Sequence, residues 1–213
     1  MKIYLIFKRI IDFILSFIAL ILLIPLWIIF SIIIKAESRG PILFKQKRIG
    51  KNKEYFYILK FRTMRTDTPK DIPTHLLNNA DSYITKFGNF LRKTSLDELP
   101  QIINILKGDM SIIGPRPALW NQDDLVAERD KYGANDVLPG LTGLAQISGR
   151  DELEIPVKAK IDGDYVKDMS LKLDIKIFFK TITKVFKHEG IVEGVHTDKA
   201  TEQEEQVIEE IKR

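Results

Sequence analysis

The sequence predicts a membrane-attached domain built from both helices and strands. Three observations support this prediction. The chain carries no charge from Phe13 to Ile34, and about 20 apolar residues are enough to cross a bilayer core of roughly 30 Å as a helix. Residues 40–64 combine apolar runs with turn residues, as a β-hairpin does. Helical patterns then return over 84–92, 99–106 and 170–187.

The composition excludes several classes of protein. The 213 residues include no cysteine, so a disulfide scaffold, a thiolate metal site and a cysteine nucleophile are excluded. The three histidines, His75, His188 and His196, do not have the spacing of metal ligands. Motifs of the types GxxxxGKS/T, GxGxxG and GxSxG are absent. The net charge of +4 fits a membrane surface or an anionic substrate, and no nucleic-acid-binding motif accompanies it.

The apolar segment is expected to stay in the membrane. A cleaved signal peptide has a shorter apolar region that ends in small residues, whereas this one continues into Lys35 and Arg39. Basic residues flank both ends, and they favour the cytoplasmic side. Pro25 removes a helical hydrogen bond in mid-segment. The pattern therefore fits either a kinked span or a helix that enters and leaves by one leaflet. Asp12, near the entry, can lie at the membrane interface and need not be buried.

A β-hairpin is predicted behind the membrane segment. Its strands would contain the apolar run 41–44 and the aromatic run 55–61. Residues 65–82 are polar and contain two prolines, which predicts a surface loop and a candidate lid for a binding site. Of the two helices that follow, the second is expected to end at Gly108. The prolines and glycines between 115 and 143 predict shaped loops.

Residues 170–187 predict an amphipathic helix. Leu171, Ile175, Phe178 and Ile182 recur at helical spacing, and the lysines fall largely on other faces. Such a helix either packs on a protein core or lies in a bilayer interface. Because another part of the chain is already in the membrane, we favour the interface.

Two neighbouring carboxylates, Asp97 and Glu98, are the first candidates for chemistry. Ser95 and Glu98 have the spacing of a capping box, so one interpretation is simply two acids in a first helical turn. Pro100 fits that turn better if Asp97 is the cap. Either way, Asp97 would lie among unpaired backbone N–H groups, which keep it ionised and attract phosphate. A carboxylate beside bound phosphate can be a nucleophile if cations offset the negative charge.

Cationic side chains that could bind phosphate are also present. Arg116 lies between two prolines, which would make its loop stiff, and a guanidinium matches phosphate oxygens bidentately. Lys60 and Arg62 end the second predicted strand, and Arg92 precedes the carboxylates. Taken singly, each of these could equally be a surface charge.

Together these motifs resemble one family, the small bacterial monotopic phosphoglycosyl transferases, also called the bacterial sugar transferase family. The resemblance extends from about Phe7 to about Lys187. It rests on the ordered segments 8–12 (KRIID), 60–64 (KFRTM), 92–101 (RKTSLDELPQ), 104–111 (NILKGDMS), 114–117 (GPRP) and 139–150 (PGLTGLAQISGR).

The resemblance implies a ping-pong transfer of a sugar 1-phosphate from a UDP-sugar to undecaprenyl phosphate, with release of UMP. Asp97 would attack the sugar-linked phosphate, and the lipid phosphate would then attack the resulting adduct. Glu98, together with Asp97, would hold Mg²⁺. The implied substrate-binding residues are Arg116, Lys60, Arg62 and Arg92.

The resemblance also implies the architecture and the location. The fold would be α+β, with an N-terminal re-entrant membrane helix bent at Pro25, interfacial amphipathic helices and a small hairpin or sheet. The expected parts are the membrane helix 1–39, a catalytic domain 40–190 and a charged tail 191–213. The catalytic domain would lie on the cytoplasmic face of the bacterial cytoplasmic membrane, in contact with membrane lipids. There it would perform the first membrane step of a glycoconjugate pathway, with downstream glycosyltransferases as candidate partners and no nucleic acid.

Two departures from the family pattern stand out. Ile24 occupies the position before Pro25, where the family often has serine. A bend there needs another hydrogen-bond donor for the backbone carbonyl that the proline leaves free. Leu144 and Ser148 stand where tryptophan and asparagine are common. Two other functions stay open at this point, namely a membrane-anchored non-catalytic scaffold of a glycosylation pathway and a lipid-phosphate hydrolase.

Overall fold

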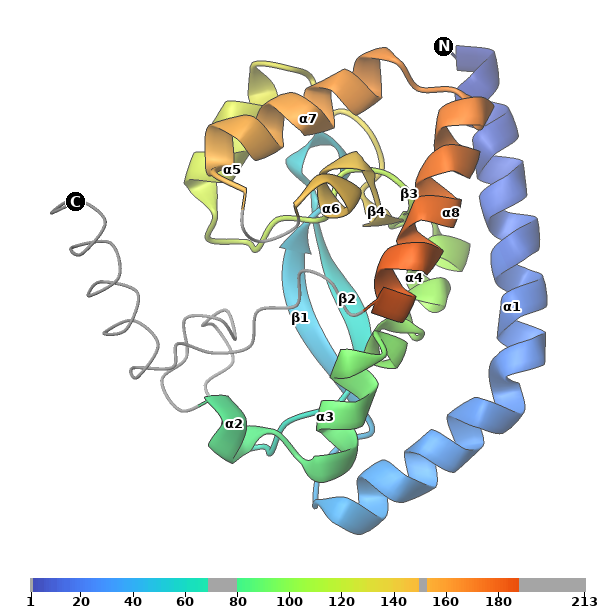
Figure 1. Ribbon diagram of the computed structural model, residues 1–213, viewed down its shortest axis with the longest axis vertical. Coiled ribbons are helices and arrows are strands. Elements are labelled where there is room, and N and C mark those ends of the chain that lie inside the picture. The colour runs from blue at the N-terminus through green and yellow to red at the C-terminus, as the bar shows by residue number, and fades with distance from the viewer. Residues whose placement is uncertain (1, 69–79, 150–152, 188–213) are drawn as a thin grey trace, which may run out of the picture.

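The computed structural model describes residues 2–68, 80–149 and 153–187. Most of the expected loop 65–82 and all of the expected tail 191–213 lie outside these residues. The described part is α+β, which confirms the expected class. A long N-terminal helix runs beside a domain that holds two small sheets (Figure 1).

The N-terminal helix α1 (Lys2–Glu37) is continuous through Pro25. At about 1.5 Å per residue, its 36 residues give a length of about 54 Å. Figure 1 shows that α1 is bent, with its C-terminal part turned towards α3 (Lys86–Lys93). A proline inside a helix is a common cause of such a bend. By length and composition α1 could cross a membrane, and only 11% of its most apolar stretch is buried against the rest of the chain.

The predicted hairpin is confirmed. Strands β1 (Leu43–Ile49) and β2 (Tyr55–Phe61) pair antiparallel, with Leu43 opposite Phe61 and Ile49 opposite Tyr55. A single 3-10 turn, Lys51–Lys53, connects them.

Helices follow the hairpin, as predicted. After α2 (Ala80–Tyr83) and α3 comes a short 3-10 helix, Leu96–Glu98, and then α4 (Gln101–Lys107). The predicted stop at Gly108 is confirmed, because this residue caps α4 in the left-handed region with φ of 97°.

The region from 111 to 149 contains more regular structure than the predicted loops. Strands β3 (Ser111–Ile113) and β4 (Gly140–Thr142) pair parallel. Their backbones approach so closely that a Cβ on Gly140 would lie 2.1 Å from the Gly114 nitrogen. Between and after these strands lie α5 (Asp123–Asp130), α6 (Leu144–Ser148) and α7 (Ile155–Lys167).

Both ends of α1 belong to the core of the domain. Near its C-terminal end, Phe30 and Ile34 are buried in one cluster with Phe61 and Leu91. Near its N-terminal end, the polar side chains at four-residue spacing, Lys8, Asp12 and Ser16, are buried. Asp12, for which the sequence allowed a place at the membrane interface, is therefore buried against the domain.

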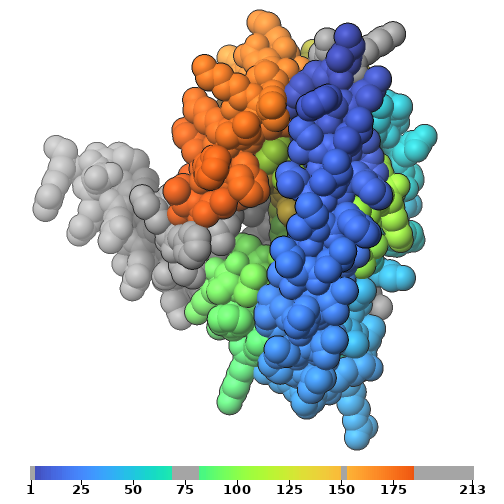
Figure 2. All heavy atoms as spheres, turned by 90° about the vertical axis from the view of Figure 1, so that its right-hand side faces the viewer, coloured from blue at the N-terminus to red at the C-terminus, as the bar shows by residue number. Residues whose placement is uncertain are grey.

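The last described helix, α8 (Leu171–Lys187), packs beside α1, and Figure 2 shows the two helices side by side on one face. Asp174 and Ile177 point into the domain and are buried. The predicted apolar face is exposed to solvent, with exposed fractions of 38–48% for Leu171, Ile175, Phe178 and Ile182. This face therefore does not pack on the core of the domain.

Candidate active site

The structure brings the predicted carboxylates together with cations from two other segments. Lys60 Nζ, at the end of β2, lies 2.7 Å from Glu98 Oε1 and 3.8 Å from Asp97 Oδ2. Arg116 donates to Glu98 through Nη2 at 2.8 Å and through Nη1 at 3.4 Å. Segments that are far apart in the sequence therefore meet at one pair of acids.

The turn that carries the acids is shaped by its neighbours. Ser95 adopts the left-handed conformation with φ of 55°, which separates the end of α3 from the 3-10 helix. Leu96 and Leu99 pack against the cluster around Phe61, and the acids between these two leucines face the cations. A tight turn fixed by apolar anchors on both sides gives Asp97 and Glu98 defined positions.

This arrangement differs from the predicted first turn of an α-helix. Ser95 makes no side-chain capping bond, and the acids lie in a three-residue 3-10 helix. Within the described residues, the hydrogen bonds to Glu98 come from Lys60 and Arg116 rather than from backbone N–H groups. The expectation that backbone N–H groups keep Asp97 ionised is wrong for the described residues, because no described backbone hydrogen bond reaches its carboxylate and burial raises its pKa.

The two acids have opposite electrostatic environments. Burial raises the pKa of Asp97, and the attraction of Lys60 opposes this only in part. For Glu98, burial also acts to raise the pKa, but the charges of Arg116 and Lys60 and their hydrogen bonds hold it well below its usual range. Glu98 is thus the firmly ionised member of the pair, and Asp97 is the one whose charge is least compensated.

Arg116 projects from a loop that is fixed on both sides. The Gly114 N–H donates to the Thr142 carbonyl at 2.9 Å, and the Gly140 N–H donates to the Pro115 carbonyl at 2.8 Å. Proline restricts the backbone on either side of Arg116. The predicted stiff loop is therefore present, and it is held by the strand pair that sequence reasoning missed.

The other two expected substrate-binding residues differ from each other. The positive charge of Arg92, on α3, acts to lower the pKa of Asp97, while its guanidinium donates to Met64 Sδ at 3.7 Å. The guanidinium of Arg62 instead donates to the carbonyls of Ser38 and Arg39 just after α1. Arg62 therefore caps the C-terminal end of α1, and none of its described hydrogen bonds reaches the acids.

Asn104 is a site residue that sequence reasoning missed. It is buried on α4, its amide donates to the Tyr57 carbonyl at 2.8 Å, and it accepts from the Leu59 N–H at 3.0 Å. These two bonds fix α4 against β2 directly before Lys60. The signal in the sequence was one polar residue on the apolar face of a predicted helix.

Asp97 and Glu98 are the described residues that could hold the expected magnesium ion. No group of three or more His, Asp or Glu residues gathers among the described residues, so a cage made only of protein ligands is not present there. Mg²⁺ is usually held by one or two carboxylates together with water and substrate phosphates. Asp97 and Glu98 supply such oxygen donors.

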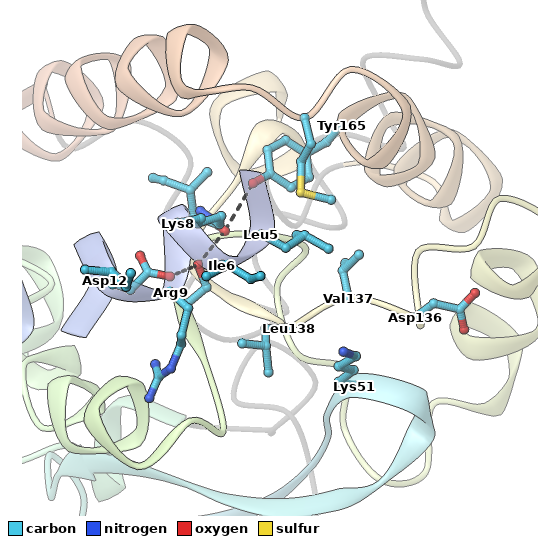
Figure 3. Close-up of a pocket in the computed structure, with 14 residues that line it drawn as sticks. Leu5, Ile6, Lys8, Arg9, Asp12, Lys51, Asp136, Val137, Leu138 and Tyr165 are labelled. Carbon is cyan, nitrogen blue, oxygen red and sulfur yellow. Dashed lines mark hydrogen bonds between the residues drawn. The ribbon is translucent and has the colours of Figure 1, made fainter. Parts of the chain in front are cut away.

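A separate cavity of about 390 Å³ lies next to the first turns of α1 (Figure 3). Residues of α1, β3, α7 and the loop 136–138 line it, and its lining includes neither the acids nor the cations around them. The acids and the cavity are therefore distinct places in the fold.

Comparison with known proteins defines the family. The model of the bacterial sugar transferase family matches residues 3–188. The exopolysaccharide production protein ExoY of Sinorhizobium fredii is 37% identical over 192 residues, which cover 84% of this chain and 84% of that protein. The chain belongs to the bacterial sugar transferase family.

Two further relatives are larger proteins. The UDP-glucose:undecaprenyl-phosphate glucose-1-phosphate transferase of Escherichia coli is 38% identical over 84% of this chain and 40% of its own length. The undecaprenyl-phosphate glucose phosphotransferase of Komagataeibacter xylinus is 38% identical over 83% of this chain and 35% of its own length. The chain thus spans well under half of these two relatives.

Proposed function

We propose that this protein transfers a sugar 1-phosphate from a UDP-sugar to undecaprenyl phosphate and releases UMP. The observation that supports this proposal most is the placement of Asp97 and Glu98 beside Lys60, Arg92 and Arg116. A buried carboxylate surrounded by cations is suited to attack a phosphate. The names of the two glucose-specific relatives make UDP-glucose the first donor to test.

In the first half-reaction, a carboxylate oxygen of Asp97 attacks the phosphorus that bears the sugar. A new P–O bond forms, the bond from this phosphorus to the UMP oxygen breaks, and UMP leaves with the electron pair. Arg116 and Lys60 are positioned to stabilise the negative charge on the phosphate oxygens during this exchange. Glu98 keeps both cations in place through its hydrogen bonds.

In the second half-reaction, a phosphate oxygen of undecaprenyl phosphate attacks the phosphorus of the Asp97 adduct. The P–O bond to Asp97 breaks, which restores the carboxylate and yields the polyprenyl diphosphosugar. Mg²⁺ held by Glu98 and Asp97 would add positive charge beside the diphosphate.

We also propose that α1 enters and leaves the bilayer by the same leaflet. Both ends of α1 pack against one domain, through Asp12 near one end and through Phe30 and Ile34 near the other. A helix that crossed the bilayer would separate these ends by the roughly 30 Å of the hydrocarbon core. The bend of α1 is visible in Figure 1, and such a bend would allow both ends, and the domain, to remain on the cytoplasmic side.

The test is release of UMP by the purified full chain with Mg²⁺, undecaprenyl phosphate and a panel of UDP-sugars. We expect release with at least one donor, and formation of a phosphosugar adduct on the peptide that contains Asp97 when the lipid is omitted. Absence of UMP with every donor would favour a non-catalytic scaffold. Transfer of the phosphosugar to water, with no lipid product, would favour a hydrolase.

A further inference from the structure

We propose that Asp12, in the membrane helix α1, positions Arg116 in the active site through strand β3. This inference rests on the function proposed above and assigns a role to a residue of the membrane segment. Asp12 is a positioning residue here, because it contacts neither Arg116 nor the two acids.

The first step of the connection is the contact between Asp12 and β3. The Ser111 hydroxyl donates to Asp12 Oδ2 at 2.7 Å, and the Ile112 N–H donates to Asp12 Oδ1 at 3.2 Å. Asp12 has an exposed fraction of only 2%, and that of Ser111 is 1%. One carboxylate thus holds both a side chain and the backbone of the strand.

The second step leads from β3 to Arg116. Ile113 ends the strand, and Gly114 and Pro115 separate it from Arg116. Backbone hydrogen bonds fix this short connection at Gly114 and Pro115, as described above. Because only two residues lie between the strand and Arg116, we expect a change in the position of Ile112 to shift Arg116.

The neighbours of Asp12 on α1 attach to other elements. Arg9 donates to the carbonyls of Ile105 and Leu106 at the end of α4, and Lys8 pairs with Asp174 of α8. Figure 3 shows that Lys8, Arg9 and Asp12 leave the same helix in different directions. Among these three, Asp12 is the one that reaches the strand leading to Arg116.

The connection from Asp12 to Arg116 is important because the guanidinium of Arg116 needs a defined orientation. Arg116 contacts both carboxylate oxygens of Glu98, and a forked guanidinium acts on phosphate only in a defined orientation. A misplacement of about 1 Å in an active site can reduce the rate by about 100-fold. Full activity therefore requires the contact between Asp12 of α1 and strand β3.

The experiment compares the full chain with Asp12→Ala, Asp12→Asn and Ser111→Ala, all purified in lipid nanodiscs. Asp12→Ala should lower kcat/KM for the UDP-sugar by about 10- to 100-fold. Asp12→Asn should recover most of this loss, since an amide oxygen still accepts from the Ile112 N–H. The matched control is Ser16→Ala, one turn further on the same buried face, which should keep wild-type kcat/KM.

A double-mutant cycle separates positioning from general destabilisation. If Asp12 acts through Arg116, adding Asp12→Ala to the Arg116→Lys variant should lower kcat/KM by less than about threefold further. The reason is that the group that Asp12 positions is already impaired. If the double variant loses kcat/KM by the full product of the two single-variant reductions, the inference is overturned. If Asp12→Ala does not fold, the same cycle with Ser111→Ala decides the question.

Hydrogen exchange gives a readout that does not depend on activity. Deuterium uptake by the segment 111–117 should rise in Asp12→Ala and stay unchanged in Ser16→Ala. Unchanged uptake in Asp12→Ala would overturn the inference even in an active enzyme. An inactive wild type with raised uptake in Asp12→Ala would instead refute the proposed function and leave the contact to β3 supported.

Discussion

At the scale of single residues, the two acids have different contacts although they are neighbours. Cations engage both oxygens of Glu98, Oε1 through Lys60 and Arg116 and Oε2 through Arg116. Among its described ion pairs, Asp97 has only the longer contact with Lys60 at 3.8 Å. A nucleophile needs an oxygen that is not already held by a hydrogen bond. The geometry therefore favours Asp97 as the nucleophile and Glu98 as the anchor of the cations.

Replacing Asp97 with Asn should abolish the reaction. An amide cannot form the proposed acyl phosphate, so we expect UMP release to fall by at least about 1,000-fold. The measurement is UMP formation with the donor found active for the wild type, with adduct detection by mass spectrometry. Asp123→Asn, the same change at an exposed position of α5, serves as the control. Substantial activity in Asp97→Asn would contradict the assignment of the nucleophile.

At the scale of elements, a buried ion pair joins α5 to α7. Arg129 and Asp162 have side-chain exposed fractions of 4% and 1%. Arg129→Met would leave Asp162 buried without its partner, so we expect destabilisation of about 3–5 kcal/mol. Thermal unfolding in detergent measures this change, and Lys131→Met, at an exposed position nearby, is the control. An unchanged melting temperature would show that the pair does not hold these helices.

A second contact between elements should make stability depend on pH. The Asn135 amide donates to Asp130 Oδ1 at 2.7 Å, and Lys53, in the hairpin turn, donates to Asp130 Oδ2 at 3.0 Å. These two hydrogen bonds, that of Asn135 most of all, lower the pKa of Asp130 below its usual range. Because the pKa of Asp130 is lowered in the folded chain, this contact stabilises the fold at pH values above the pKa of Asp130 in the unfolded chain. The stabilisation is lost as the pH falls through the pKa of Asp130 in the folded chain.

The expected result is a lower melting temperature for Asp130→Asn than for the wild type at pH 7. The difference should shrink as the pH falls below about 4. The effect should be small because the Asp130 side chain is 45% exposed. A difference that does not change between pH 7 and pH 3.5 would contradict the link to titration.

The sequence predicted the elements whose signals are local. Two apolar runs around a turn were enough for the hairpin, and Gly108 was enough for the end of α4. Strands β3 and β4 are only three residues long, too short for an alternating pattern, and their pairing depends on close packing between Gly114 and Gly140.

The candidate site was predictable as a set of residue types and less so as a set of contacts. The dyad, Lys60 and Arg116 meet as expected. The partners of Arg62 and Asp12 could not be inferred, because each lies far away in the chain. The carbonyl of Arg39 is 23 residues from Arg62, and Ser111 is 99 residues from Asp12.

At the scale of the whole molecule, exposed apolar side chains of α1 and α8 lie on adjacent helices (Figure 2). Apolar patches of this extent mark membrane or protein contacts. In a chain without cysteine, Phe178→Cys should be protected from a water-soluble maleimide in vesicles, whereas Lys180→Cys on the same helix should react. Equal labelling of the two variants would contradict burial of this face in lipid.

The same cysteine-free background tests the topology of α1. Ile3→Cys and Ala36→Cys, near the two ends of α1 and both exposed in the structure, should both resist an impermeant maleimide added outside spheroplasts. Both should react once the membrane is permeabilised. Labelling of one end from outside would show that α1 crosses the bilayer.

The buried polar face of α1 also constrains how the protein is made. During synthesis α1 leaves the ribosome before the elements it packs against, because Ser111 follows Asp12 by 99 residues and Asp174 follows Lys8 by 166. At about 5–20 residues per second, the second delay lasts about 10–30 s. During this time the helix must rest at the bilayer with a lysine and an aspartate uncovered, close enough to water to stay hydrated. Completion of α8 then closes the last of these contacts, so newly made chains should become compact only after nearly the whole domain has been synthesised.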